Sequence, residues 1–251
     1  MKNISVLLFL LITLALNAQN NKTSGLNARQ FHKYWKVESE SPDYKVTFLG
    51  DTVEILSPKG LTLWRKEKMS GKVTIEYDAC VVVEVEGDRL SDLNCFWMAS
   101  DPQYPDNIWK REKWRSGIFL NCYSLQLYYM GYGGNHNSTT RFRRYDGNEA
   151  AITNAKARPA ILKEYTDADH LLEANKWYHI KITNENNRVS YYINGVRLVD
   201  FRDAAPLTEG WFGFRTTLSR TRIANFHYEC SPQEISEIPL HWIGNTPQQD
   251  R

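Results

Sequence analysis

Seven apolar residues occupy alternate positions along residues 73–85, namely Val73, Ile75, Tyr77, Ala79, Val81, Val83 and Val85. The positions between them are mostly polar or charged: Thr74, Glu76, Asp78, Cys80, Val82 and Glu84. Because successive side chains of a strand point to opposite faces, this period of two predicts one long strand with one face on a core.

Shorter segments of the same kind predict further strands near residues 45–49, 52–56, 60–65, 90–99, 117–130, 139–145, 177–183, 188–194, 197–202, 211–218 and 222–229. Asn186-Asn187 and Asn194-Gly195 predict tight hairpin turns, because Asn and Gly tolerate positive φ. A helical period is weak, with at most a short turn near residues 167–174. This many strands with closely spaced turns predict an all-β fold, a two-sheet antiparallel jelly-roll sandwich.

The two ends of the chain depart from the strand pattern. Lys2 precedes an apolar run from Ile4 to Leu16, which is too short to span a membrane. A positive start, a short apolar run and Ala18 are typical of a signal peptide, so we expect residues 1–18 to be removed and the protein to be periplasmic or secreted. Residues 19–251 are expected to form a single β-sandwich domain, with the last twenty residues as a tail packed over it.

Charge is unevenly distributed, although the formal net charge is only +2. Residues 109–158 carry nine Lys or Arg and three acidic residues. A local positive field attracts anionic ligands, and the expected export makes a nucleic acid an unsuitable partner. The four cysteines lack metal-ligand spacing, so no metal or other cofactor is expected. Disulfides and buried thiols remain equally open for Cys80, Cys95, Cys122 and Cys230.

Residues 128–145 concentrate the polar chemistry of the chain. A predicted strand ends in a Gly-rich turn, and a second predicted strand follows it. The turn and one face of the second strand present Asn135, His136, Asn137, Arg141, Arg143 and Tyr145. Cations beside an aromatic and several hydrogen-bonding groups suit an anionic, hydroxyl-rich ligand such as an acidic sugar. The alternative is an edge hairpin whose arginines are merely solvated.

Hydrolase chemistry lacks a complete motif. Glu76 and Asp78 resemble the catalytic Glu-x-Asp-x-(x)-Glu strand of sandwich-fold endoglucanases, but Cys80 and Val81 stand where a second carboxylate is needed. Retaining glycoside hydrolysis needs two carboxylates, so we interpret Glu76 and Asp78 as a solvated strand face. The sequence also lacks a Gly-x-Ser-x-Gly elbow, a P-loop and a His-Glu-x-x-His motif.

β-Elimination from a uronic acid fits these residue types better. A cation or amide must neutralise the carboxylate so that negative charge can develop in the transition state. A Tyr or His then removes the C5 proton, and the same or a second group protonates the oxygen that leaves C4. We expect His136 as the base, Tyr132 as the acid and Arg143 as the carboxylate partner. Candidate substrate-binding residues are Asn135, Arg141, Tyr129, Tyr145, Arg215, Arg220 and Trp97.

Four pieces of the chain carry a family resemblance: Asp92-Leu-Asn-Cys-Phe-Trp97-Met-Ala-Ser-Asp101-Pro, Tyr129-Met-Gly-Tyr-Gly-Gly-Asn135 through Thr139-Thr-Arg141-Phe-Arg143-Arg144-Tyr145, Asn175-Lys-Trp-Tyr178, and Gly210-Trp-Phe-Gly-Phe-Arg215-Thr-Thr. They resemble a family of small concanavalin A-like (jelly-roll) secreted proteins from polysaccharide-utilisation loci of marine and gut bacteria. The resemblance spans about residues 30–229, and its arginine-rich piece is the most specific. That family includes a dehydratase for ulvan oligosaccharides. The resemblance therefore implies a carbon–oxygen lyase that removes water from a non-reducing-end uronate and leaves a 4,5-unsaturated sugar.

We accordingly expect an exported dehydratase whose partner is an acidic oligosaccharide, with no nucleic-acid or membrane partner. The alternatives are a polysaccharide lyase that cuts the glycosidic C4–O bond and a non-catalytic protein that binds acidic carbohydrate. We expect one groove on one sheet, with residues 100–116 as a wall and Trp109 or Trp114 near its rim. The side chains expected to face this groove are Asn135, Arg141, Arg143, Arg215 and at least one of Tyr129, Tyr132 and Tyr145. The sequence does not predict the oligomeric state.

Overall fold

The computed structural model describes residues 24–232, so the expected signal peptide and the expected tail after residue 232 lie outside the described residues. The strands are β1 (Trp35–Ser39), β2 (Lys45–Leu49), β3 (Thr52–Arg65), β4 (Met69–Ser70), β5 (Lys72–Val82), β6 (Leu93–Ser100), β7 (Gln126–Gly133), β8 (Thr139–Asp146), β9 (Lys163–Tyr165), β10 (Tyr178–Glu185), β11 (Arg188–Ile193), β12 (Val196–Arg202) and β13 (Glu209–Ser231). The helices are short: α2 (Phe31–Tyr34), α3 (Glu112–Arg115), α4 (Gly134–Asn137) and α5 (Ala150–Thr153). The 3₁₀ turns are η1 (Ile108–Arg111), η2 (Phe119–Ser124), η3 (Ala155–Ala157) and η4 (Ala168–His170).

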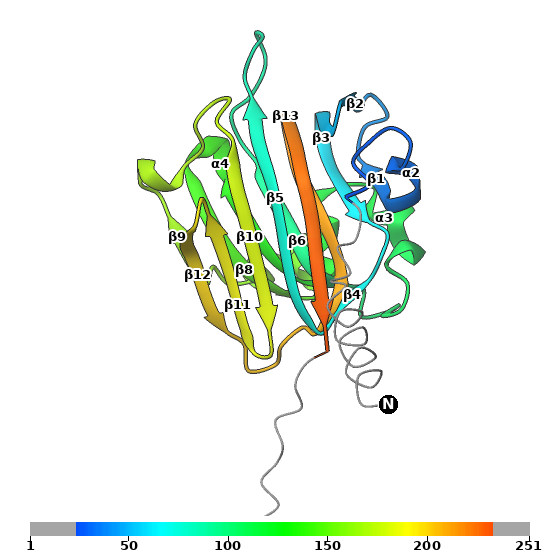
Figure 1. Ribbon diagram of the computed structural model, residues 1–251. Helices are drawn as coiled ribbons and strands as arrows, with labels where there is room; N and C mark the ends of the chain where they lie inside the picture. Colours follow the sequence, from blue (N-terminus) through cyan, green and yellow to red (C-terminus); the bar gives the residue numbers. More distant parts are fainter. Residues whose placement is uncertain (1–23, 233–251) are drawn as a thin grey trace, which may run out of the picture.

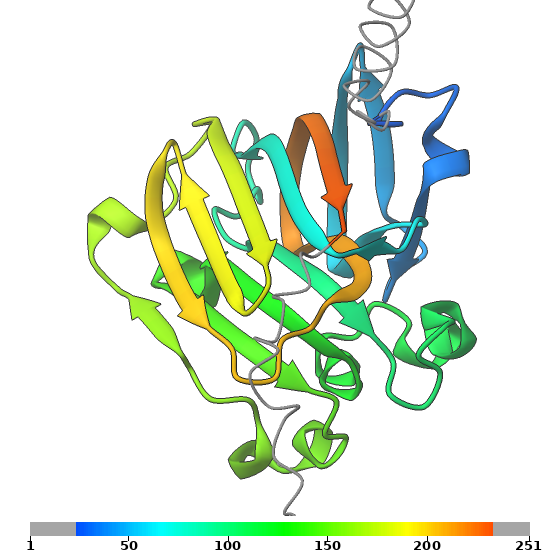
Figure 2. The same ribbon diagram turned by 60° about the horizontal axis from the view of Figure 1, so that its bottom comes forward.

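The strands pair antiparallel in the order β12-β11-β10-β5-β13-β6-β7-β8-β9, and β3 pairs along β13. The long strand β13 joins the two layers of the sandwich. Its first part pairs with β6, its last part pairs with β5, and the register shifts between Thr217 and Ser219. Leu218 has a φ of 51° at this shift. Figures 1 and 2 show β13, in orange, at the junction of the front layer (β5, β10, β11, β12) and the rear layer (β6, β7, β8).

Two apolar clusters hold this arrangement together. The larger one fills the space between the layers and contains residues from both, among them Ile75, Trp97, Tyr132, Ile180 and Phe214. The smaller one lies on the outer face of the rear layer, where η1, η2 and α5 cover part of the sheet, and includes Phe96, Ile108, Tyr123, Leu127 and Tyr129. The rear layer is therefore apolar on both faces over part of its length, and the side-chain period of two decides which cluster each residue joins.

The predicted all-β jelly-roll sandwich is confirmed, as are both Asn-containing hairpin turns. Asn186, Asn194 and Gly195 all have positive φ there. Other expectations need correction. The strand predicted over 117–130 begins only at Gln126, because residues 119–124 form η2. The strand predicted over 73–85 ends at Val82, and Val85 is exposed.

The predicted strand pairs 52–56/60–65 and 211–218/222–229 are in each case one continuous strand, β3 and β13. The strands β1, β4 and β9 were not predicted. Each is five residues or shorter. Such short segments depend on their neighbours more than on their own pattern.

Three cysteines in the described part of the chain, Cys80, Cys95 and Cys122, are buried thiols that form no disulfide. Burial raises the pKa of the Cys95 thiol to about 12 and that of the Cys122 thiol to about 11. Thiols in such surroundings are poor nucleophiles and act as small apolar side chains of the core. The open choice between disulfides and buried thiols is thereby decided for these three residues.

Candidate functional site

Strand register brings the predicted cationic residues onto one face of the rear layer. Arg215 on β13 pairs with Asn94 on β6, Asn94 pairs with Gly131 on β7, and Gly131 pairs with Arg141 on β8. The adjacent row contains Tyr129 opposite Arg143. Residues in register across antiparallel strands share a face, so residues far apart in the sequence become neighbours. Arg215 and the arginines of β8 therefore lie on the same face of one sheet.

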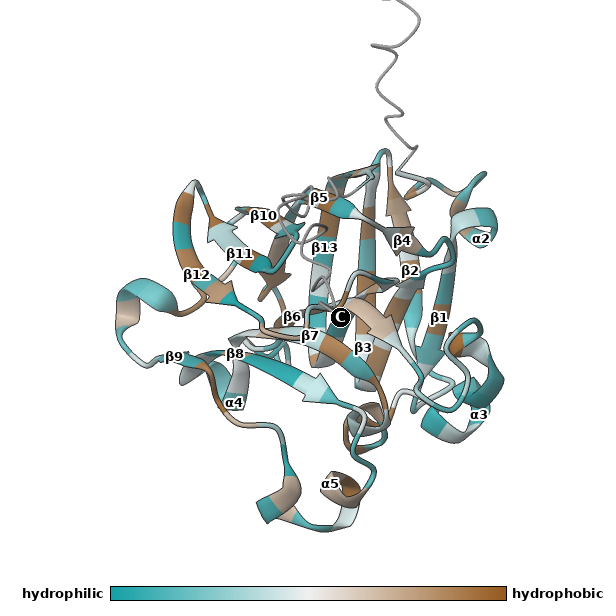
Figure 3. Ribbon diagram, turned by 90° about the horizontal axis from the view of Figure 1, so that it is seen from below, coloured by the Kyte–Doolittle hydropathy of each residue, from teal (hydrophilic) through white to brown (hydrophobic). Residues whose placement is uncertain are grey.

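A cleft of about 410 Å³ opens on this face between β6, β7 and β8. Its lining includes six of the residues predicted from the sequence, which are Tyr129, Asn135, His136, Arg141, Arg143 and Tyr145. One wall comes from η2, through Phe119 and Tyr123. The cleft has the size typical of a small-molecule site. Figure 3 shows that β8, which forms one side of it, is largely hydrophilic.

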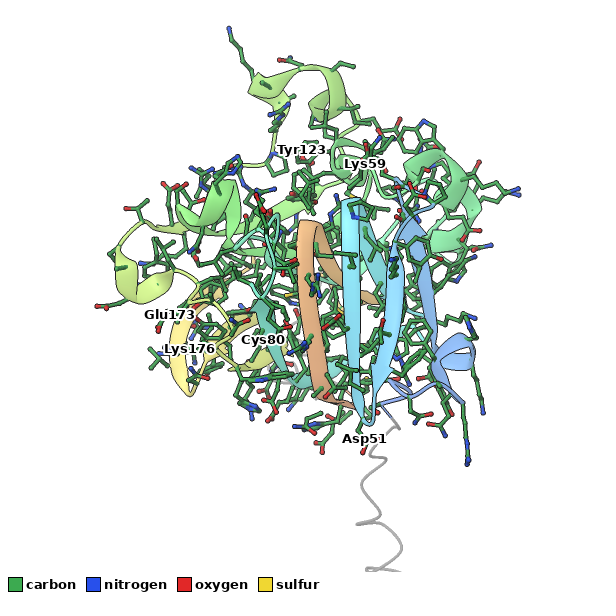
Figure 4. All side chains as sticks on the ribbon, turned by 90° about the horizontal axis from the view of Figure 1, so that it is seen from above. Asp51, Lys59, Cys80, Tyr123, Glu173 and Lys176 are labelled. Atoms are coloured by element: carbon green, nitrogen blue, oxygen red, sulfur yellow. The ribbon has the colours of Figure 1, made fainter. Side chains whose placement is uncertain are left out.

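Four arginines give the cleft its charge: Arg89, Arg141, Arg143 and Arg158. Arg141 donates from Nε to Glu164, and Arg143 donates to the carbonyl oxygen of Pro159. The Arg158 guanidinium lies 5.8 Å from the centre of the Tyr123 ring. Figure 4 labels Tyr123 next to the light-green segment that follows β8. Asp92 is the one carboxylate among the described residues of the lining. The cleft is therefore suited to an anion.

Two tyrosines form the apolar floor of the cleft. Burial raises the pKa of the Tyr129 phenol and of the Tyr145 phenol, so both are protonated at neutral pH. Gly131 makes room for Tyr129, because a Cβ at residue 131 would lie 2.4 Å from Tyr129 Oη. The Tyr129 hydroxyl thus lies over Gly131, between the strands that carry Asn94 and Arg141.

The turn between β7 and β8 is left-handed. Asn135, His136 and Asn137, which belong to the short helical segment α4, all have φ between 51° and 59°. A left-handed conformation costs L residues roughly 1–2 kcal/mol each, and three in succession are unusual. Backbone strain of this kind persists only where the surroundings impose it, and it is common at functional sites.

Neighbouring segments impose this conformation on the turn. Asn137 Nδ2 donates to the carbonyl oxygen of Leu172, and the Leu172 N–H donates to Asn137 Oδ1, both over 2.8 Å. Asn135 Nδ2 donates to Thr139 Oγ1 over 3.0 Å. His136, whose own side chain is exposed, is consequently held at the mouth of the cleft.

The side of the cleft formed by β6 was missed at the sequence level. Arg89 Nη2 pairs with Asp92 Oδ2 over 3.2 Å, and Asn94 Nδ2 donates to Asp92 Oδ1 over 3.1 Å. Asp92 has a φ of 65°. Asp92 and Asn94 belong to one of the four pieces that carry the family resemblance. That resemblance was the signal in the sequence that could have indicated this side of the cleft.

Two predicted site residues, Tyr132 and Trp97, do not reach the cleft, and their assignments are corrected. Tyr132 lies on the opposite face of β7, where its hydroxyl donates to the carbonyl oxygen of Leu171 over 3.1 Å. Trp97 is fully buried between the layers and stacks on Phe142. Both occupy the strand positions whose side chains point inward, which excludes contact with a ligand in the cleft.

Arg215 and Arg220 also differ from expectation. Arg215 is on the expected face but is buried beneath the segment that follows α3, where Nη1 donates to the carbonyl oxygen of Gly117 over 2.6 Å. Arg220 follows the register shift in β13 and pairs instead with Asp88 over 3.2 Å. Neither residue lines the cleft, so Arg215 supports its wall and Arg220 is not part of it.

The loop expected as a wall is also placed differently. Among residues 100–116, Trp109 lines a separate hollow of about 550 Å³ beside β1 and β2. Trp114 is exposed and packs against the Arg111 guanidinium. That hollow contains none of the predicted site residues and is lined mainly by apolar side chains. We therefore place the candidate site in the arginine-lined cleft.

Replacing Gly131 by alanine is expected to displace Tyr129 and reshape the cleft. The added Cβ would come within 3.0 Å of three atoms of the Tyr129 side chain, and overpacking of this kind costs about 1–3 kcal/mol. Denaturant unfolding measures this loss. In a Tyr129→Phe background the added methyl group no longer meets a hydroxyl, so the loss should be smaller. Equal losses in the two backgrounds would contradict the close approach.

A comparison with known families decides where the chain belongs. The family described as Domain of unknown function (DUF6250) matches residues 55–226, well over half of the chain. The chain belongs to this family. Every residue that lines the cleft, from Arg89 to Thr217, falls within the DUF6250 match. No curated protein matches the chain.

Solved structures share the fold at low sequence identity. A Bacillus subtilis protein of unknown function with a galectin-like fold has a TM-score of 0.62 and 15% identity, covering 80% of this chain and 91% of its own. The exoplasmic/lumenal domain of VIP36 in its Ca²⁺/Man-bound form has a TM-score of 0.58 and 9% identity, and the match covers 88% of this chain and 93% of that domain. Carbohydrate binding module CBM66 from Bacillus subtilis has a TM-score of 0.51 and 18% identity, and the match covers 78% of this chain and 94% of that module. These similarities establish the jelly-roll fold of the DUF6250 chain.

Two other kinds of feature are missing from the described residues. Within residues 24–232, no helix is long and apolar enough to cross a membrane. In the same residues, no group of three or more His, Cys, Asp or Glu side chains gathers in a way that suits a metal ion.

Proposed function

We propose that the cleft binds the acidic end of a uronate-containing oligosaccharide and eliminates water from it, leaving a 4,5-unsaturated uronate. The observation that supports this proposal most is the joint placement of Arg141, Arg143, Asn135 and His136 around protonated Tyr129. A carboxylate partner, a proton acceptor and a proton donor are the groups that the reaction requires. The exported location expected from the first residues suits a glycan substrate.

Arg143 and Arg141 are the proposed partners of the substrate carboxylate. Negative charge builds up on this carboxylate as the C5 proton leaves, and guanidinium groups in a partly buried cleft stabilise it strongly. Arg143 is half-buried and is positioned by its hydrogen bond to the carbonyl oxygen of Pro159. A planar guanidinium can bind both carboxylate oxygens at once, which fixes the orientation of the sugar.

His136 and Tyr129 are the proposed proton-transfer residues. His136 accepts the C5 proton, the C4–O bond breaks as the C4=C5 double bond forms, and Tyr129 protonates the departing hydroxide so that water leaves. Tyr129 replaces Tyr132 as the proposed acid, because Tyr129 lines the cleft and its raised pKa keeps the phenol protonated. These elimination steps need no oxidant or reductant.

Glycoside hydrolysis has less support in the same cleft. It requires two carboxylates on either side of the scissile bond, whereas the lining contains Asp92, which is engaged by Arg89 and Asn94. Glu76 and Asp78 lie on the other layer, where they pair with Lys181 and His179 respectively. Their pairing supports the interpretation of these carboxylates as a solvated strand face.

Non-catalytic binding of an acidic carbohydrate is the second candidate. It is supported by two of the similar structures, one of which is a carbohydrate binding module and the other a mannose-bound domain. A glycan lyase would use the same cleft with a sugar as the leaving group at C4. The three candidates differ in their products and can be separated by one experiment.

Incubation with ulvan oligosaccharides tests these candidates. We expect ultraviolet absorbance from a double bond conjugated to the carboxylate, together with a mass loss of one water and no shortening of the chain. Absorbance accompanied by shorter products would indicate a lyase that cuts the glycosidic bond. Saturable binding without absorbance would indicate a binding protein. The absence of both binding and absorbance would refute the proposal.

His136→Ala is expected to lower turnover by at least about a hundredfold, since general acid–base groups contribute roughly 10²–10⁴-fold. Binding of the oligosaccharide should be retained, because Arg141 and Arg143 remain. His32→Ala is the matched control, as His32 is also exposed but lines the separate hollow beside β1. Initial rates and dissociation constants are the measurements. Near-normal turnover of the His136 variant would exclude this residue as the base.

A further inference from the structure

A second basic hollow lies on the outer face of the front layer, across the sandwich from the arginine-lined cleft. It has a volume of about 460 Å³ and lies on β5, β10, β11 and β12, which Figure 1 shows side by side. Its cationic lining residues are Lys72, Arg188, Arg197 and Arg202. The cleft and this basic hollow share no lining residue, so the hollow is a separate feature of the molecule.

Strand register places two arginines of the basic hollow directly opposite each other. Arg188 on β11 pairs with Arg202 on β12. Val189 and Tyr191 of β11 point into the core, so Arg188 points outward. Like charges directly opposite each other on one face of a sheet are destabilising. A bound anion at this position would relieve the repulsion between the two guanidinium groups.

The nearest carboxylate does not balance the arginines. Asp200 accepts hydrogen bonds from Arg188 Nε and Nη2, each over 2.6 Å, and lies 3.3 Å from Arg197 Nη1. The Arg202 guanidinium forms no hydrogen bond or ion pair within residues 24–232. One negative charge is therefore shared among three guanidinium groups, and the donors of Arg202 are available to a ligand.

The available donors are accessible from solvent. Arg202 is exposed, and 44% of the Arg188 side chain is exposed despite its contact with Asp200. A guanidinium stays charged at physiological pH and presents a planar fork of donors that matches the oxygens of a carboxylate or a sulfate. Glu185, the one carboxylate among the described residues of the lining, lies 3.0 Å from Lys72 Nζ, which offsets its charge. The basic hollow thus offers an anion an open, positively charged site.

The neutral residues of the lining favour an acidic glycan over a nucleic acid. Hydroxyl groups that can bond to a sugar come from Thr74, Thr183, Ser190 and Tyr192. Tyr192 is the one aromatic residue in the described part of this lining, whereas sites for single-stranded nucleic acids stack successive bases on several aromatic rings. The acidic oligosaccharide proposed for the cleft belongs to the favoured class of ligand.

We propose that the basic hollow is a second glycan site, where Arg188 and Arg202 bind a sulfate or carboxylate group within an acidic polysaccharide. The choice of a glycan rests on the proposed function, whereas the anion site rests on the two arginines. Because the hollow and the cleft lie on opposite faces, the second site holds the polymer and takes no part in the elimination. Tethering to the polymer raises the effective concentration of chain ends at the cleft. Arg197 contacts Asp200 and is assigned no ligand contact.

Calorimetric titration with three polymers tests the proposal. Dextran sulfate carries sulfate alone, polygalacturonate carries carboxylate alone, and dextran is neutral. Wild-type protein is expected to bind at least one of the acidic polymers and not dextran, and the more tightly bound polymer identifies the anionic group. Arg202→Glu should weaken this binding about tenfold or more, the effect of one lost hydrogen bond to a charged group. Turnover of short oligosaccharides by this variant should be unchanged.

Two matched variants separate the basic hollow from other cationic surfaces. Arg29→Glu makes the same change of charge at an exposed arginine that lines neither the basic hollow nor the cleft, so it should bind the polymer as wild type does. Arg143→Ala removes a cation of the cleft and should lose turnover while it keeps its affinity for the polymer. All titrations are made at physiological ionic strength, where charges farther apart than about 8 Å are largely screened.

Each outcome of the titrations has a definite meaning. Weakened polymer binding in Arg202→Glu, with binding kept in both control variants, supports the proposal. Wild-type affinity in Arg202→Glu, an equal loss in Arg29→Glu, or a loss confined to Arg143→Ala overturns it. Absence of binding to both acidic polymers by wild-type protein also overturns it, as does tighter binding to single-stranded RNA. Polymer binding that depends on Arg202, without any turnover of oligosaccharides by wild-type protein, would refute the proposed elimination and leave the second site standing.

Discussion

Arg143→Ala is expected to reduce turnover of ulvan oligosaccharides by about a hundredfold to a thousandfold, the range found when one group that stabilises transition-state charge is removed. Arg143 lies in register with Tyr129, so its guanidinium and the proposed acid face the same part of the cleft. Loss of the hydrogen bond to the carbonyl oxygen of Pro159 should cost stability by only about 1 kcal/mol. Initial rates and unfolding curves separate the two effects.

Arg143→Lys should recover little of this activity. Lysine keeps the positive charge but loses the planar fork that binds both oxygens of a carboxylate. Arg197→Ala is the matched control, because Arg197 is an exposed arginine of β12 that pairs with Asp200 over 3.3 Å, away from the cleft. Unchanged turnover in Arg143→Ala would remove this residue from the proposed site. A lysine variant as active as wild type would show that charge alone is needed.

The cationic side of the cleft was predictable because it is local in sequence. Arg141, Arg143 and Tyr145 alternate along a single strand, and the side-chain period of two places them together whatever the rest of the fold does. Asn135 and His136 follow from the adjacent turn. The placement of Tyr129 on this face and Tyr132 on the other depends on the same parity, and a tyrosine three positions away necessarily points to the opposite side.

The remaining parts of the site depend on contacts that no local pattern specifies. Asn94 joins Arg141 only through the pairing of β6 with β7 and of β7 with β8. The residues of η2 were predicted as strand because they are mostly apolar, yet they form a wall by packing on the outer face of the sheet. Arg220 lies beyond the register shift at Leu218, where it stands opposite Leu56 of β3 and pairs with Asp88, so it falls outside the cleft.

The wall formed by η2 is held through a buried ion pair at the edge of the rear layer. Arg115 is fully buried, and its Nη2 donates to Glu38 Oε2 and to the carbonyl oxygen of Ile108, each over 2.8 Å. Glu38 lies in register with Thr62, which in turn pairs with Arg215. Arg115, at the end of α3, and Arg215, through its hydrogen bond to the Gly117 carbonyl oxygen, therefore hold the short segment that leads into η2.

Arg115→Met is expected to lower the free energy of unfolding by about 3–5 kcal/mol, because it leaves the Glu38 carboxylate buried without its partner. Urea denaturation measures this loss. The double variant Glu38→Leu/Arg115→Met removes both charges and should be more stable than the single variant, since an apolar pair avoids the desolvation of an unpaired ion. The single variant should also bind uronate oligosaccharides more weakly, because Phe119 and Tyr123 lose part of their support. A double variant as unstable as Arg115→Met would mean that arginine packing, and not the unpaired carboxylate, accounts for the loss.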